Sequence, residues 1–244
     1  MNVRDGRVGQ QRFETATGGS LVEGYGLSEA SPVTHVNPLE GERRRGSIGI
    51  PLPDTDQRVV DPDGRTPLPV GEVGELEVQG PQVMLGYYRQ ADETAAVLDD
   101  GWLRTGDLAR LDADGYAYVV DRKKDMINVG GMKVYPREVE EVLRTHPGVA
   151  DVAVVAAPDP TLGEVPRAYI VRRAGSAVEA PELIALVRSH LAHYKAPRSV
   201  EFRTGLPKSG IQKTLRRVLR DEAFGRSTPP GATPTAEAAN PGTR

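Results

Sequence analysis

The chain has 244 residues, of which 38% are apolar and 27% charged, and its formal net charge is −3. These values are typical of a globular protein with room for two domains, and they exclude the strongly basic surface that nucleic acid requires. Cysteine is absent, which excludes disulfides, thiolate metal sites and a cysteine nucleophile. We find neither an apolar signal-peptide run nor the roughly 18 apolar residues of a membrane span, so we expect a cytoplasmic protein.

Residues 46–121 consist of short strand-like segments separated by turn signals. The 27 glycines and 20 prolines of the chain favour many turns. Asp63-Gly64 and Asp114-Gly115 are typical of hairpin turns, because glycine accepts the positive φ that such turns need. We expect a small β-barrel or twisted sheet in this region.

Residues 122–224 alternate between helices and strands. The expected helices begin at Pro136, at Pro181 and near residue 213, and the expected strands cover 149–157, 167–173 and the region of Val200. On the last helix, apolar residues face the core, and three arginines are expected to face water: Arg216, Arg217 and Arg220. This order predicts a compact α+β domain, so the fold class of the whole chain is mixed α/β (α+β). Residues 225–244 lack apolar periodicity and are expected to form a disordered tail.

Four segments contain the residues that point to a chemistry. They are EGYGLSEASP (23–32), GWLRTGDLA (101–109), DRKKDMINVGGMKVYPREVEE (121–141) and LPKSGIQKTLRR (206–217). In this order and at this spacing they resemble the acyl-adenylate-forming superfamily, which includes acyl-CoA synthetases, adenylation domains and firefly luciferase. The resemblance covers about residues 12–220.

In the first segment, the resemblance implies that the chain lies against a nucleotide. It implies that Tyr25 packs on adenine beside Gly26, that Ser28 contacts the phosphate, and that Glu29 binds Mg²⁺, an ion that prefers oxygen ligands. The alternative is a glycine-containing turn with a capping serine and a surface glutamate. A serine hydrolase is disfavoured, because Ala30 replaces the second glycine of a nucleophile elbow.

The second and third segments imply a ribose site and a hinge. By resemblance, Asp107 accepts hydrogen bonds from the ribose hydroxyls, Arg122 helps to hold the ribose, and Lys124 is the hinge about which the C-terminal domain rotates between two half-reactions. Without the resemblance, Thr105-Gly106-Asp107 reads as a polar turn before a strand, and the basic run at 122–124 reads as a solvated linker.

The remaining two features belong to the C-terminal domain. By resemblance, Gly130 and Gly131 line a channel for pantetheine, and Lys213 is the catalytic lysine that meets the carboxylate and α-phosphate oxygens. Gln212 occupies a position at which the family commonly has glycine. The alternative reading of Lys213 is the basic start of a helix that faces solvent.

The resemblance implies a two-step reaction with ATP, Mg²⁺ and CoA. A carboxylic acid reacts with ATP to give acyl-AMP, and the CoA thiol then attacks to give a thioester, so no cysteine of the protein is needed. The wording GYGLSEASPVTHVNP resembles that of fatty acyl-CoA ligases. A small carboxylic acid, ATP and CoA are therefore the expected partners.

One element of the family is not found upstream of the first segment: a Ser/Thr/Gly-rich loop that grips the ATP phosphates. We therefore expect residues 1–45 to be a remnant of the large N-terminal domain, 46–121 the β-rich subdomain and 122–224 the mobile domain. Two alternatives stay open. The chain is a non-catalytic fragment or interaction module, or an adenylating enzyme that loads a carrier protein. An upstream-encoded N-terminal half is a further expected partner.

Overall fold

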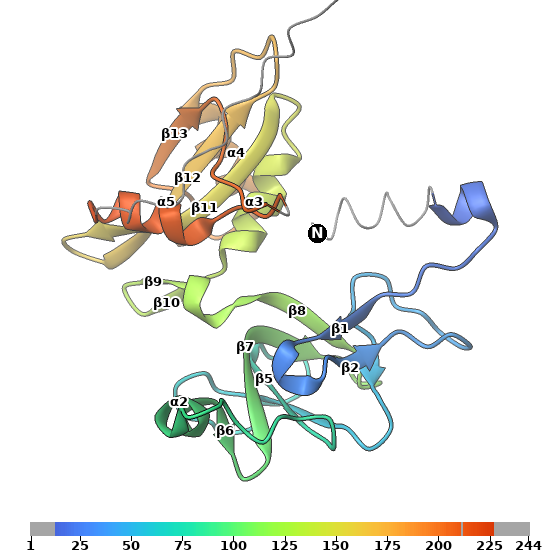
Figure 1. Ribbon diagram of the computed structural model, residues 1–244. Coiled ribbons are helices and arrows are strands. Elements are labelled where there is room, and N and C mark those ends of the chain that lie inside the picture. Colours follow the sequence, from blue (N-terminus) through green and yellow to red (C-terminus); the bar gives the residue numbers. More distant parts are fainter. Residues whose placement is uncertain (1–12, 211, 227–244) are drawn as a thin grey trace, which may run out of the picture. The chain divides into compact units, whose positions relative to one another are not determined.

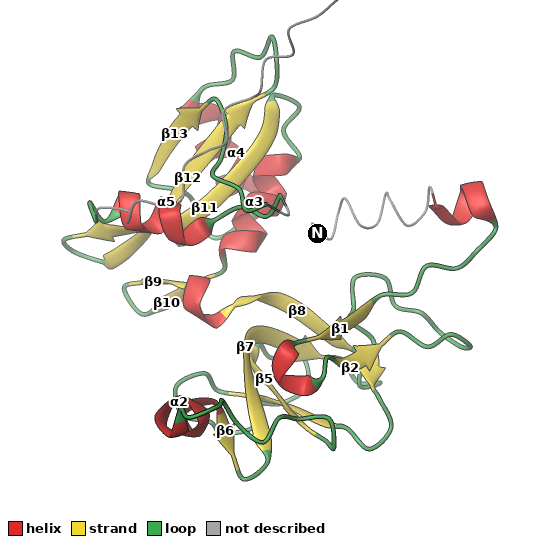
Figure 2. Cartoon of the chain, in the orientation of Figure 1, coloured by secondary structure: helices red, strands yellow, loops and turns green. Residues whose placement is uncertain are grey.

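The computed structural model describes residues 13–210 and 212–226 (Figure 1). Contacts divide the chain into two compact units, Met1–Lys124 and Asp125–Arg244, each with its own hydrophobic core. Except for residues 225 and 226, the expected disordered tail lies outside the described residues. Helices, short strands and long loops all occur in Figure 2, and the expected mixed α/β class is confirmed.

The first unit contains two antiparallel sheets. The smaller sheet has the order β1 (Gly24–Gly26), β2 (Val33–Val36), β3 (Ile50–Pro51), with the 3₁₀ helix η1 (Ser28–Ala30) between β1 and β2. The larger sheet has the order β4 (Asp56–Val60), β5 (Gly74–Gln79), β7 (Trp102–Leu111), β6 (Leu98–Asp99), and β8 (Ala117–Arg122) also pairs with β7. The short helix α2 (Ala91–Val97) precedes β6.

A shared core joins η1 to the larger sheet. Ala30 of η1 is fully buried and packs in the same cluster as Leu76 of β5 and Leu103 of β7. Burial of these apolar side chains is worth about 25 cal/mol per Å² of area removed from water. The segment that follows Tyr25 is therefore held against the sheet that contains Asp107.

The two expected hairpin turns differ in their geometry. Gly115 has φ +82° between β7 and β8, as the Asp114-Gly115 signal predicts. After β4, however, the left-handed residue is Arg65, with φ +59°, and not Gly64. The Asp61 carboxylate accepts the amide hydrogens of Asp63 and Gly64, which places the left-handed position one residue later.

The second unit is a five-stranded mixed sheet with helices on both faces. Its elements in chain order are β9 (Ile127–Val129), β10 (Met132–Val134), α3 (Pro136–Arg144), β11 (Val149–Asp159), β12 (Gly163–Arg172), α4 (Ala180–His190), η3 (His193–Lys195), β13 (Ser199–Arg203) and α5 (Arg216–Ala223). The sheet order is β10-β9-β12-β11, and β13 pairs with β12 in parallel. The helices and strands expected from Pro136 onward are confirmed, with the last helix beginning later than expected.

The apolar run of β11 is explained by burial of both of its faces. Successive side chains of a strand point to opposite sides. Val152 and Val154 pack in the core that α3 and α4 cover, whereas Ala153 and Val155 pack in a second core with Leu219 of α5. A strand with two covered faces is apolar throughout and does not alternate.

The last helix begins at Arg216 because the described residues before it, 206–210 and 212–215, form a loop. Lys208 and Thr214 face one another in an isolated antiparallel bridge, and the Leu215 amide donates to the Pro207 carbonyl oxygen. The expectation that Arg216 faces water is wrong. Its guanidinium is paired with Glu140, whose side chain is only 3% exposed. No helix in the described part of the chain combines the length and the apolar composition that a membrane span requires.

Candidate functional site

The centre of the candidate site is a hydrogen bond between two of the expected nucleotide-binding residues. The Tyr25 hydroxyl donates to Oδ2 of Asp107 over 2.6 Å, and Nε of Arg122 lies 3.3 Å from Oδ1 of the same carboxylate. Tyr25 comes from β1, Asp107 from β7 and Arg122 from β8. Three residues that the sequence places up to 97 positions apart (122 − 25) therefore meet at one carboxylate of the first unit.

A β-bulge directs Asp107 toward Tyr25. Glu75 pairs with Leu108 and Glu77 pairs with Arg104, so more residues lie on β7 than on β5 between these two pairs. Gly106 occupies the bulge with φ +71°, a left-handed conformation that glycine adopts without strain. Thr105-Gly106-Asp107 is thus an irregularity inside a strand, and its reading as a turn before a strand is wrong.

Thr105 supports the bulge from within. Its hydroxyl donates to the Leu76 carbonyl oxygen over 2.8 Å and accepts the Asp107 amide hydrogen over 3.1 Å. This hydroxyl therefore fixes the backbone on which the Asp107 side chain stands. This role of Thr105 could not be inferred from the sequence, because its partner Leu76 lies on another strand.

The electrostatics of the cluster keep Tyr25 protonated. Burial, and then the charge of Asp107, raise the pKa of Tyr25 well above its ordinary value. The phenol is therefore a hydrogen-bond donor throughout the physiological pH range. Arg122 is 52% exposed and supplies the positive charge on the solvent side of Asp107.

His35 packs against Tyr25 and is a site residue that the sequence did not reveal. Its ring lies 5.9 Å from the Tyr25 ring in an edge-to-face arrangement, and it is fully buried. Nε2 lies 2.9 Å from Oε1 of Gln57, and Nδ1 lies 2.8 Å from the Thr34 hydroxyl. Because Gln57 donates with its amide to the Gly115 carbonyl oxygen, its Oε1 is an acceptor and we assign the proton of neutral His35 to Nε2.

The turn after β1 presents Ser28 and Glu29. A side chain at position 26 would place its Cβ 1.8 Å from the Pro32 carbonyl oxygen, so only glycine fits there. Ser28 is exposed at the start of η1. Glu29 accepts a hydrogen bond of 2.9 Å from the Tyr87 hydroxyl on Oε1, and its backbone oxygen accepts the Met84 amide hydrogen.

Glu29 is the residue expected to bind a metal ion. Among the described residues, no group of three or more His, Asp or Glu side chains is arranged to hold a metal ion. Mg²⁺ is usually bound by one or two carboxylates together with substrate phosphates and water, and a single glutamate fits that pattern. Tyr87 was not singled out in the sequence, although its hydroxyl orients this carboxylate.

Lys213 lies in the second unit, on the loop before α5. Its amide donates to the Ser209 hydroxyl, and its carbonyl oxygen accepts the Ser209 amide hydrogen over 2.8 Å. The side chain is exposed. Gln212 beside it has φ +59°, so the position that the family commonly gives to glycine has the left-handed geometry that favours glycine.

Gly130 and Gly131 form the two-residue turn of the β9–β10 hairpin. Both have positive φ, +57° and +91°, as a type I′ turn requires. The turn is held by the Leu162 carbonyl oxygen, which accepts the Gly130 amide hydrogen, and by Asn128, which accepts the Gly131 amide hydrogen. Lys124 lies in the 3₁₀ turn η2 (Lys123–Asp125), where the two units meet in the sequence.

The structure brings together the expected residues of the first unit, whereas those of the second unit lie on separate segments. In the first unit, Tyr25, Asp107 and Arg122 are in contact, and Gly26, Ser28 and Glu29 share the turn that follows Tyr25. In the second unit, Lys213 lies on its own loop and Gly130-Gly131 on the β9–β10 turn. The first unit thus contains the residues expected to bind the nucleotide, and the second unit contains the exposed Lys213 on a hydrogen-bonded loop.

Comparisons with known proteins identify the family of the chain. The family model described as AMP-binding enzyme matches residues 7–88, and the model described as AMP-binding enzyme C-terminal domain matches residues 138–213. The chain belongs to the AMP-binding enzyme family. Three of the four motifs overlap these matches, and GWLRTGDLA (101–109) lies between the two matched ranges.

The matched relatives are ligases. The chain is 50% identical over 214 residues to a long-chain-fatty-acid–CoA ligase of Bacillus subtilis (strain 168), a match that covers 87% of the chain and 38% of the relative. It is 47% identical over 202 residues to a feruloyl-CoA synthase of Amycolatopsis sp, covering 82% of the chain and 41% of that protein. The chain therefore spans about two fifths of the length of these relatives.

A solved structure shares the fold. ATP-bound MatB from Rhodopseudomonas palustris matches with a TM-score of 0.81 and 34% identity, covering 87% of this chain and 42% of MatB. The apo structure of the same MatB matches over the same 87% with a TM-score of 0.63.

Proposed function

We propose that the chain takes part in the ATP-dependent activation of a carboxylic acid as acyl-AMP and in its transfer to the thiol of CoA. The observation that carries the proposal is the contact of Tyr25, Asp107 and Arg122 in one unit of an AMP-binding family member. The 50% identity to a long-chain-fatty-acid–CoA ligase favours a fatty acid as the substrate.

In the proposed adenylation step, a carboxylate oxygen of the acid attacks the α-phosphorus of ATP and pyrophosphate leaves. Asp107 accepts hydrogen bonds from the ribose hydroxyls, and Arg122 adds a positive charge beside them. Lys213 stabilises the negative charge that develops on the α-phosphate oxygens. Glu29 would hold Mg²⁺ together with the phosphates, and the bound ion would lower the repulsion between the acid and the triphosphate.

In the proposed second step, the CoA sulfur attacks the acyl carbon and AMP leaves. The thiol comes from the substrate, which agrees with a chain that has no cysteine. The Gly130-Gly131 turn presents backbone without side chains to the pantetheine arm. In the proposed rotation at Lys124, Lys213 leaves the nucleotide and this turn takes its place.

Calorimetric titration of the purified chain with a non-hydrolysable acyl-AMP analogue tests the nucleotide site. We expect binding that Asp107→Asn weakens and that Tyr118→Phe does not, because the Tyr118 hydroxyl contacts Asp112 and lies outside the cluster. A folded chain that does not bind the analogue would contradict the proposed site and favour a non-catalytic role.

The role of Lys213 is tested by separating the two steps. Lys213→Ala is expected to depress acyl-AMP formation by orders of magnitude and to spare thioester formation from preformed acyl-AMP. Arg217→Ala is the control, since Arg217 is exposed on the neighbouring turn of α5. Equal loss in both steps contradicts the assignment. Offering CoA and a phosphopantetheinyl carrier protein side by side identifies the acceptor.

A further inference from the structure

The segment that joins the two units is short and is followed at once by buried structure. β8 ends at Arg122 and β9 begins at Ile127, which is fully buried in the core of the second unit. The chain divides between Lys124 and Asp125. Any rotation between the units must therefore be absorbed by the few residues from Lys123 to Met126.

The residue before Lys124 is anchored to the first unit. Nζ of Lys123 lies 2.9 Å from Oε2 of Glu75 on β5 and also donates to the Pro62 carbonyl oxygen. The Glu75 side chain is only 4% exposed, and Arg104 is its second partner at 3.2 Å. Because a buried carboxylate requires positively charged or hydrogen-bonding partners, the Glu75 side chain holds the Lys123 ammonium group in place.

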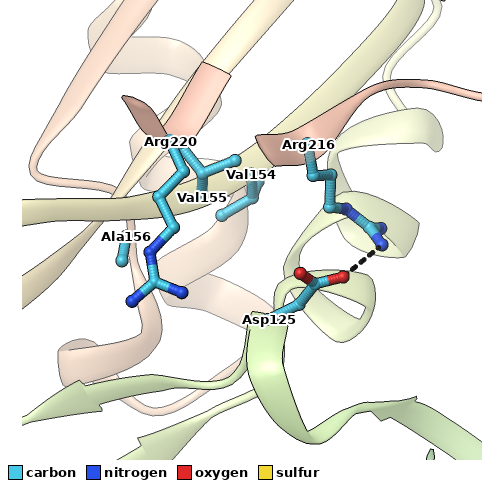
Figure 3. Close-up of a pocket in the computed structure, with 6 residues that line it drawn as sticks. All are labelled: Asp125, Val154, Val155, Ala156, Arg216 and Arg220. Carbon is cyan, nitrogen blue, oxygen red and sulfur yellow. Dashed lines mark ion pairs between the residues drawn. The ribbon is translucent and has the colours of Figure 1, made fainter. Parts of the chain in front are cut away.

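The residue after Lys124 is tied to the second unit by a different buried carboxylate. Glu140 of α3 accepts hydrogen bonds from Arg216 on both oxygens, at 3.2 and 2.8 Å, and from the Val154 amide at 2.9 Å. Arg216 in turn lies 3.6 Å from Oδ2 of Asp125 (Figure 3). Asp125 is thereby linked to the body of the second unit through α3, β11 and α5.

The same arginine begins the helix that follows the Lys213 loop. A bidentate guanidinium–carboxylate pair fixes both distance and orientation, so α5 and the end of the loop are held to α3. Whatever moves Asp125 relative to the first unit also moves Lys213 as part of one body.

We propose that Glu75 and the Glu140–Arg216 pair are positioning residues that anchor Lys123 and Asp125 on either side of Lys124 and so confine rotation between the units to the backbone of Lys124. The proposal rests on the hinge of the proposed function. It adds the residues that limit the hinge to one position, and it explains why a basic and an acidic residue flank Lys124.

The test uses the full chain and needs no ligand. Because the chain has no cysteine, spin labels can be placed uniquely at Ala95→Cys on α2 and Ala185→Cys on α4, two exposed positions in different units. Double electron–electron resonance then measures the distribution of distances between the two spin labels. Hydrogen exchange of the peptide spanning 121–127 reports the order of the joining segment.

Lys123→Gln and Asp125→Asn remove the anchors and leave Glu75 with Arg104 and Glu140 with Arg216, so the fold is retained. We expect each variant to broaden the distance distribution and to accelerate exchange in the joining segment by about tenfold. Arg217→Gln and Asp92→Asn make the same charge changes at exposed positions and are expected to alter neither measurement. Folded variants with unchanged widths and unchanged exchange overturn the proposal.

Lys124→Pro separates the failure of the anchors from the failure of the hinge. Proline fixes φ at about −65°, so a rotation located at Lys124 is restricted and the distance distribution is expected to narrow. Narrowing by Lys124→Pro without broadening by the anchor variants would retain the hinge and reject the anchors. An unchanged distribution in Lys124→Pro would reject the hinge itself.

Discussion

The Tyr25 hydroxyl and the Asp107 carboxylate form a 2.6 Å hydrogen bond although 82 positions separate them. Tyr25 lies on a strand of one sheet and Asp107 on a bulge of another, and the shared core beneath η1 holds both sheets together. The contact links an aromatic ring to an acceptor that also pairs with Arg122, and it defines where a nucleotide is expected to bind.

This contact predicts graded losses of nucleotide affinity. Asp107→Asn removes a charged acceptor and is expected to weaken binding of the acyl-AMP analogue about 10- to 100-fold. Tyr25→Phe keeps the ring and removes one hydrogen bond, so a loss of about 3- to 10-fold is expected. Calorimetry measures both. A larger loss in Tyr25→Phe than in Asp107→Asn would contradict the assigned roles.

A second prediction concerns the orientation of Glu29. Tyr87→Phe removes the 2.9 Å hydrogen bond to Oε1 and is expected to raise the Mg²⁺ concentration needed for ATP binding about 3- to 10-fold. Tyr88→Phe is the matched control, because the neighbouring Tyr88 is 80% exposed. Calorimetric titration with ATP at several Mg²⁺ concentrations distinguishes the two variants. An equal Mg²⁺ requirement in both would show that Tyr87 does not orient Glu29.

The buried His35 predicts a pH dependence of stability. Burial lowers the pKa of His35 below its ordinary value, which the unfolded chain retains at about 6.5. As pH falls below about 6.5, the unfolded state binds a proton that the folded state excludes, so the free energy of unfolding falls by up to about 1.4 kcal/mol per pH unit until the folded pKa is reached. Above about pH 6.5 this term is absent.

Urea unfolding at two pH values on either side of this transition, followed by fluorescence, checks the prediction. Trp102 is the single tryptophan and lies in the first unit, as His35 does. His35→Gln is expected to reduce the pH dependence, whereas His190→Gln, at an exposed histidine of the second unit, is expected to leave it unchanged. If His35→Gln retains the full slope, another group is responsible.

A fourth prediction follows from the left-handed conformation of Gln212. A non-glycine residue in this conformation costs about 1–2 kcal/mol. The backbone strain at position 212 should therefore increase from Gly through Asn and Gln to Val. Trypsin cleavage after Lys213 is a direct measure of loop opening. We expect the slowest cleavage in Gln212→Gly and the fastest in Gln212→Val. The reverse order would show that φ at this position does not control the loop.

Much of the fold could be predicted from the sequence because its signals are local. Pro136 and Pro181 mark the first turns of α3 and α4, Gly115 marks the β7–β8 hairpin, and the apolar run beginning at Val149 marks a strand with two buried faces. Each signal acts within a few residues of itself through φ, a missing amide hydrogen or side-chain periodicity. The motif segments likewise indicated the family.

The contacts within the site and at the joining segment were decided only by the tertiary structure. Arg216 resembles a solvated helix residue in the sequence, yet it pairs with the buried Glu140, 76 positions away. Thr105-Gly106-Asp107 resembles a turn, yet the pairing of β5 with β7 makes it a bulge that points Asp107 at Tyr25. Such outcomes depend on which group, distant in the sequence, packs against a side chain and buries it. The neighbouring residues in the chain do not identify that partner.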